Sequence, residues 1–112
     1  MIGNVLAELL GIVQSAQALL REPDDWSEGV RMLRLAEAVA GDVPSRLLAD
    51  VETFSLIAGL RTDLDACLFA AEQLIDAGVA RSVVTSVLKR GAAAAEETLE
   101  AVLRTEAVAA GA

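Results

Sequence analysis

The segment VVTSVLKRGAAAAEETLEAV, residues 83–102, combines the composition of a β-strand with the periodicity of a helix. Three valines and a threonine within residues 83–87 favour a strand. No other segment of the sequence is a strand candidate that could pair with it. Apolar and small residues nevertheless recur at helical spacing through the whole segment: Val84, Leu88, Gly91, Ala95, Leu99 and Val102. This spacing predicts one long helix over 80–109, in which a bend or an end would fall at Gly91.

Helical spacing also dominates the sequence before residue 80. Residues that break helices separate the apolar stretches: Pro23, Gly41, Gly59 and Gly78. The helices are expected at 3–21, 26–41, 44–59 and 62–78. With a length of 112 residues, the chain has room for one domain, residues 1–112. The sequence thus predicts an all-α domain of about five helices in a helical bundle, with the last helix the longest.

Local signals refine these boundaries. Asp25 followed by Glu28 predicts a capping box for the second helix, and Thr62 is the expected N-cap of the fourth. Pro44 suits the first turn of the third helix, and Gly78 followed by a valine predicts a Schellman stop. The inward faces are expected to be Leu47, Val51, Phe54, Ile57 and Ala58 on the third helix and Leu64, Cys67, Leu68, Ala71, Leu74 and Ile75 on the fourth.

The composition argues against catalysis and against metal binding. The sequence has no His and no Tyr, so it lacks the commonest general base and metal ligand. Its single cysteine, Cys67, falls on an apolar helix face, where a thiol behaves as a small hydrophobe. The carboxylates with suggestive spacing fit solvated helix faces better than a metal site: Asp63, Asp65, Glu96, Glu97 and Glu100. We therefore expect no enzyme, no cofactor and no metal.

Charge and hydropathy bear on the partners. The net charge of −8 disfavours nucleic acid, whose phosphates would be repelled. The first 20 residues are apolar, but polar residues interrupt them: Asn4, Glu8, Gln14 and Gln17. This interruption argues against a signal peptide and a transmembrane span, and the polar face lacks the cations typical of interfacial helices. We expect a cytoplasmic protein that does not bind membranes.

Three features favour protein–protein contact. Phe69 falls among polar residues, opposite the apolar face of its helix. Gly91 and Ala95 are small residues in an apolar stripe, which would let another helix approach closely. Apolar residues also remain in surplus off the main stripes: Leu10, Met32, Leu35, Val39, Leu56 and Leu60. The predicted second helix is apolar on most sides, which is typical of a helix that is central in a bundle or shared with a partner. The candidate interface residues are Leu35, Val39, Leu56, Leu60, Phe69, Gly91 and Ala95.

These features predict a non-enzymatic helical protein that mediates protein–protein interaction or assembly. It would be a homo-oligomer or a subunit of a larger protein assembly. A small structural or adaptor component, for example one from a virus, would fit this description. The alternative is a small acidic binding protein that inhibits or neutralises a basic partner surface. Such a protein would gather its carboxylates on one face.

Overall fold

The described residues fold into four α-helices and one short 3-10 helix. The structure, a computed structural model, describes residues 2–44, 48 and 51–111. The elements in chain order are α1 (Ile2–Leu20), η1 (Pro23–Asp25), α2 (Trp26–Gly41), α3 (Val51–Asp76) and α4 (Arg81–Gly111). Within these ranges no residue is in a strand. The all-α class and the helical bundle are confirmed, as is the last helix as the longest, with 31 residues.

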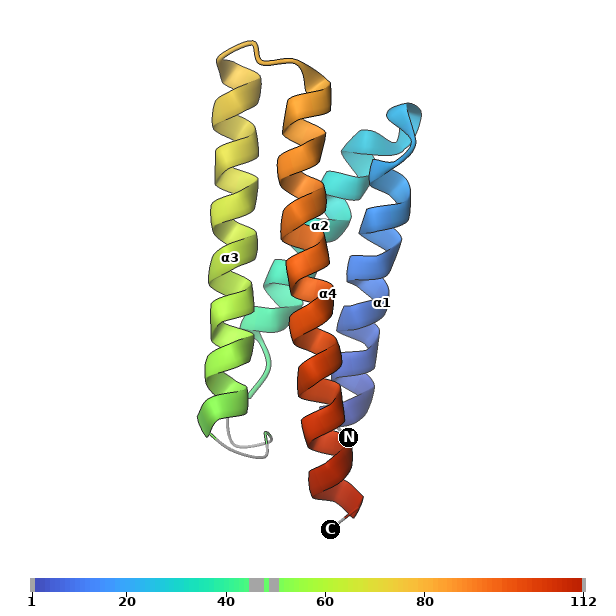
Figure 1. The fold of residues 1–112 in the computed structure, drawn as a ribbon, viewed down its shortest axis with the longest axis vertical. Helices are drawn as coiled ribbons and strands as arrows, with labels where there is room; N and C mark the ends of the chain where they lie inside the picture. Colours follow the sequence, from blue (N-terminus) through green and yellow to red (C-terminus); the bar gives the residue numbers. More distant parts are fainter. Residues whose placement is uncertain (1, 45–47, 49–50, 112) are drawn as a thin grey trace.

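Successive helices run in opposite directions and form an elongated bundle of 51 × 21 × 18 Å (Figure 1). Each helix packs against the one that follows it, and α4 packs against α1, so the ring of four helices closes. Figure 1 shows α2 crossing obliquely behind α4, while α1, α3 and α4 lie closer to the long axis. This up-and-down order follows from the short connections at residues 21–25 and 77–80, which force neighbouring helices to be antiparallel.

The number of helices differs from the prediction. The helices expected at 44–59 and 62–78 are one continuous helix, α3, which begins at Val51 and not at Pro44. Thr62 is not an N-cap: its Oγ1 donates a hydrogen bond of 3.0 Å to the carbonyl oxygen of Ala58, one turn earlier. A threonine that bonds back in this way fits inside a helix. Gly59 is also tolerated there, since a single glycine costs only about 1 kcal/mol.

The valine-rich segment of α4 is helical, as its periodicity predicted. Val84 and Leu88 are fully buried on the inner face, so packing outweighs the strand propensity of residues 83–87. Gly91 lies in the middle of α4 and does not end it. The long helix expected over 80–109 is confirmed, with bounds at Arg81 and Gly111.

Two predicted turn signals have opposite outcomes. Gly78 adopts a φ of +76° and donates its N–H to the carbonyl of Ile75 at 3.0 Å. The N–H of Val79 reaches the carbonyl of Leu74, also at 3.0 Å, so the Schellman stop is confirmed. The capping box is wrong, because the Asp25 side chain makes no capping hydrogen bond to α2. The 3-10 turn η1 leads directly into α2 instead.

The core is built from residues spaced three or four apart along each helix, as in coiled coils. The largest fully buried side chains are Leu6, Leu9, Val13, Leu33, Ile57, Leu64, Val84, Leu88, Leu99 and Val102. The inward face expected for residues 44–59 is partly wrong. Val51 is 80% exposed, Phe54 is 40% exposed and Ala58 is exposed, while Thr53 and Leu60 are buried. Ile75 is also exposed, and Leu47 lies outside the described residues.

Candidate interaction surface

One side of the bundle, where α1 lies beside α2, carries a set of incompletely buried apolar side chains. The ion pair between Arg34 of α2 and Glu72 shows which side of α2 faces α3. The other side of α2, towards α1, presents Met32, Leu35 and Val39. The matching side of α1 presents Val5, Ile12 and Leu19 at seven-residue spacing. We name these six residues the α1/α2 face: Val5, Ile12, Leu19, Met32, Leu35 and Val39.

Burial on this face is incomplete. Leu35 is 46% exposed, and the other five side chains are half-buried. Within α1, only 28% of the residues of Gly3–Leu20 are buried inside the bundle. The same segment is long and apolar enough to span a membrane by length and composition alone, and it is the one described helix of that kind. The chain's own packing therefore fully buries less than a third of this helix, and the residues left exposed are small or polar.

The α1/α2 face carries few charges. Glu8 is the single charged residue of the 19 in α1, and the α2 charges beside the face, Glu28 and Arg31, lie two turns and one turn before Leu35 and pair with each other. By contrast α3 carries five acidic residues and one basic residue, and α4 carries four acidic residues and four basic ones. An acidic chain meets least repulsion where its carboxylates are few, so this surface suits close approach of a second acidic molecule.

The structure divides the candidate interface residues into three groups. Leu35, Leu56 and Phe69 are exposed, and Val39 is half-buried. Leu60 and Ala95 are buried at 3% and 4% exposure in the chain's own core. Gly91 is half-buried against Cys67 of α3, so its small size serves packing within the chain. The last three residues are thus already covered without a partner.

The exposed apolar residues of α3 have a different setting from Leu35. Leu56 is 42% exposed, with Glu52 one turn before it and Asp63 two turns after it. Phe69 is 61% exposed, and carboxylates surround it on the helix surface: Asp65, Glu72 and Asp76. These side chains are isolated apolar positions on an acidic helix, whereas Leu35 has Met32 and Val39 beside it, and the charges one and two turns before it are paired with each other.

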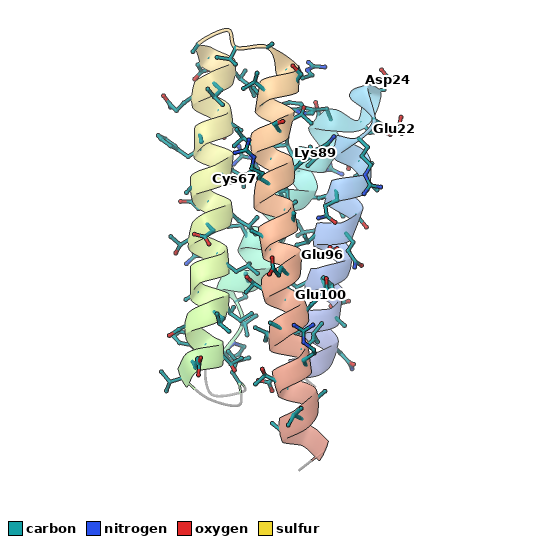
Figure 2. The ribbon with its side chains drawn as sticks, in the orientation of Figure 1. Glu22, Asp24, Cys67, Lys89, Glu96 and Glu100 are labelled. Carbon is teal, nitrogen blue, oxygen red and sulfur yellow. The ribbon has the colours of Figure 1, made fainter. Side chains whose placement is uncertain are left out.

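Cys67 is half-buried between α3 and α4 (Figure 2). Its thiol donates a hydrogen bond of 3.4 Å to the carbonyl oxygen of Val87 on α4. Burial raises the pKa of the thiol above its ordinary value of 9.0, and a hydrogen bond at Gly91 offsets part of that rise. A thiol with a raised pKa is a poor nucleophile and a poor metal ligand near neutral pH.

The end of the bundle where α1 finishes and α4 begins contains three adjoining cavities. The largest, of about 350 Å³, is lined by residues of α1, α2 and α4, among them Arg21, Trp26 and Arg81. A second, of about 250 Å³, lies between Trp26 and the α3–α4 turn. The third, of about 150 Å³, is lined by Gln17, Arg21 and Lys89. In the part of the chain that the structure describes, no three carboxylate or thiol groups converge as they would to hold a metal ion.

Sequence reasoning missed two parts of these surfaces. The seven-residue spacing of Val5, Ile12 and Leu19, just beside the core positions of α1, was the signal for the α1/α2 face. The cavities depend on how three helix ends meet, and the residue spacing within a single segment does not predict them.

Comparison with protein-family models, with curated proteins and with solved structures finds no match for this chain.

Proposed function

We propose that this protein is a non-enzymatic helical assembly subunit that self-associates through the α1/α2 face. The observation that carries the proposal is the coincidence of incomplete burial and sparse charge on that face. Contiguous apolar surface of this kind marks interaction sites more often than solvated surface. The free thiol of Cys67 is compatible with the reducing cytoplasm, where we place the protein.

A second copy of the same chain is the occupant that the charges favour. With a net charge of −8, two copies repel each other unless they meet where carboxylates are sparse. The α1/α2 face is such a place, because Glu8 is its only charged neighbour on α1 and Glu28 beside it on α2 is paired with Arg31. Two-fold symmetry would bring the same face of each copy together, so one apolar surface covers another.

The size of the face sets the expected affinity. A helix of 19 residues is about 28 Å long, and a pair of helices 8–10 Å apart presents a face on the order of 600 Å². Stable complexes bury about 800 Å² on each partner, so this face is at the lower end of the range. We therefore expect dissociation in the micromolar range, which makes the oligomer dependent on concentration.

Sedimentation velocity of a matched pair of variants tests the proposal. Leu35→Asp places a charge in the α1/α2 face, and Leu56→Asp places the same charge at a leucine of similar exposure on α3. We expect the wild type and Leu56→Asp to dimerise at about 100 μM and Leu35→Asp to remain monomeric, as a buried unpaired carboxylate costs several kcal/mol. Equal behaviour of the two variants would contradict the proposal, and circular dichroism verifies that both remain folded.

Membrane association is the competing explanation for the apolar side of α1. Flotation with vesicles of neutral and of anionic lipid distinguishes it from self-association. We expect the protein to stay in the aqueous fraction with both compositions. Flotation that Leu35→Asp abolishes would assign the α1/α2 face to a lipid surface, and the proposed dimer would then be wrong.

A second candidate function is binding of a basic partner, and one observation favours it. Phe69 is 61% exposed on α3, whose charged residues are five acidic and one basic. An aromatic anchor within carboxylates suits a basic amphipathic helix. Fluorescence anisotropy of a labelled Lys- and Leu-rich helical peptide would show binding that salt weakens and Phe69→Ala reduces. Peptide binding that Phe69→Ala leaves unchanged would count against this candidate.

A further inference from the structure

The cavities at the end of the bundle gather positive charge in an otherwise acidic protein. The chain has nine basic residues and a net charge of −8. Three of the nine line this one groove: Arg21 from the end of α1, Arg81 from the start of α4, and Lys89 two turns further along α4. They come from segments about 60 residues apart in the sequence. The fold therefore creates a cationic groove that the composition gives no hint of.

These cations have no carboxylate partner. Among the described residues, the ion pairs are Arg31 with Glu28 and Arg34 with Glu72, both outside the groove. No Asp or Glu is among the described residues that line these three cavities. Figure 2 shows Glu22 and Asp24 at the turn beyond the end of α1, and Glu96 and Glu100 two to three turns past Lys89 on α4. The lining itself is thus positively charged.

The backbone and hydroxyl groups of the groove add hydrogen-bond donors. The first turn of α4 begins here, and the carbonyl of Ala80 accepts the N–H groups of Val83 and Val84. The N–H groups before them have no partner within the helix, and the helix dipole adds partial positive charge. The hydroxyl side chains of the lining point to the same ligand class: Ser82, Thr85 and Ser86. Cations, hydroxyls and a helix start together fit a phosphate group.

An apolar compartment adjoins the cationic one. Trp26 and Arg81 line both the 350 Å³ and the 250 Å³ cavities, and the Arg81 guanidinium lies 5.2 Å from the centre of the Trp26 ring. The smaller cavity is otherwise lined by Ile75, Val79 and Val84. The cation–π contact places the Arg81 guanidinium at the boundary between the two compartments. A ligand that fills both must carry a phosphate and an apolar group.

We propose that this groove binds a phosphate monoester of a small aromatic or aliphatic alcohol. Arg21, Arg81 and Lys89 neutralise the phosphate dianion, and the compartment beside Trp26 receives the organic group. The site goes beyond the proposed assembly function and is separate from it. It uses the side of α1 that faces α4, whereas the α1/α2 face is on the side towards α2.

The protein carries its own reporter for this site. Trp26 is the single tryptophan, and the chain has no tyrosine, so its fluorescence reports on the groove alone. The probes are phenyl phosphate, inorganic phosphate and phenol, each titrated while Trp26 emission is recorded and the heat of binding is measured by calorimetry. We expect phenyl phosphate to saturate the signal, inorganic phosphate to bind at least tenfold more weakly, and phenol to give no saturation.

Lys89 and Arg90 are adjacent in the sequence and provide a matched pair of variants. Lys89→Ala and Arg90→Ala each remove one positive charge, but only Lys89 lines the groove. Loss of one charge-assisted contact is expected to weaken phenyl phosphate about tenfold in Lys89→Ala and less than twofold in Arg90→Ala. Equal weakening in both variants would mean diffuse attraction and would overturn the site. Absence of saturation with phenyl phosphate, or equal affinity for inorganic phosphate, would overturn it as well.

Discussion

Gly91 of α4 lies directly against Cys67 of α3: a Cβ atom at Gly91 would be 2.5 Å from the Cys67 Sγ and 3.1 Å from its Cβ. Both distances are shorter than van der Waals contact permits. The glycine therefore allows the close approach of α3 and α4, since a larger residue would have to displace the Cys67 side chain or one of the helices. The hydrogen bond from the Cys67 thiol to the Val87 carbonyl is made at the same contact.

Gly91→Ala is expected to destabilise the protein by about 1–3 kcal/mol, because overpacking outweighs the gain in helix propensity. Gly59→Ala is the matched control, since nothing lies within 4 Å of a Cβ there. That variant is expected to stabilise the protein by about 0.5–1 kcal/mol. Chemical denaturation measures both. The double variant Cys67→Ala/Gly91→Ala should recover part of the loss, and no recovery would show that the clash is not with Sγ.

The Cys67 thiol gives a second prediction, which concerns pH. Its pKa is higher in the folded chain than the ordinary value of 9.0, because burial favours the neutral form. The folded state therefore keeps the proton at pH values where the unfolded chain has lost it. This contribution to stability is fully present below pH 9 and falls as the pH rises through the folded-state pKa.

Denaturation of the wild type and of Cys67→Ala between pH 7 and 11 isolates this contribution from other titrating groups. The difference in unfolding free energy between the two proteins should be constant near pH 7. Above pH 9 the unfolding free energy of the wild type should fall relative to that of Cys67→Ala. Alkylation of the native thiol by iodoacetamide should be slower than in the denatured chain. A native rate equal to the denatured rate would mean that Cys67 is not protected.

Thr62 distinguishes the single helix α3 from the two shorter helices that the sequence suggests. An N-cap threonine replaced by alanine costs about 1 kcal/mol. Inside a helix, with its hydroxyl bonded to the Ala58 carbonyl, the same exposed position gains a few tenths of a kcal/mol from alanine. Thermal denaturation of Thr62→Ala should therefore show an unchanged or slightly raised Tm. A clear drop would restore a helix start at Thr62.

The helical class, the long final helix and the stop at Gly78 could be predicted because each depends on a local pattern with one physical meaning. The continuity of α3 could not be predicted from the sequence, since Gly59 and Thr62 are compatible both with a break in the helix and with a helix interior. Long-range packing decided the outcome, as Ile57, Leu60 and Leu64 keep one buried stripe through that region.

The candidate surface was predicted only in part. Leu35 and Val39 emerged as apolar residues off the main stripe, and they lie on the α1/α2 face. Leu60, Gly91 and Ala95 looked equally available in the sequence, but the close approach of α3 and α4 covers them. Helix pairing decides which apolar positions remain open. A sequence without identified helix neighbours does not supply that information.

Salt provides a prediction about the forces in the proposed dimer. At low ionic strength the repulsion between two chains of charge −8 opposes association, and about 0.15 M salt screens it beyond roughly 8 Å. Burial of the apolar α1/α2 face does not weaken with salt. The dissociation constant should therefore stay constant or fall between low and moderate salt, as sedimentation equilibrium would show. A dimer that dissociates as salt rises would be held by ion pairs and not by this face.

The most direct test of the central claim is a distance between two copies of the chain. Spin labels at Ser15→Cys or at Ser55→Cys, each in a Cys67→Ala background, report the distance between protomers by pulsed electron paramagnetic resonance. Both serines are exposed, Ser15 on α1 beside the α1/α2 face and Ser55 on the outer side of α3, across the bundle. If copies meet at the α1/α2 face, the Ser15 labels give a defined distance that is shorter than that of the Ser55 labels. A shorter distance at Ser55, or no dipolar coupling at either position at about 100 μM, would contradict self-association through this face.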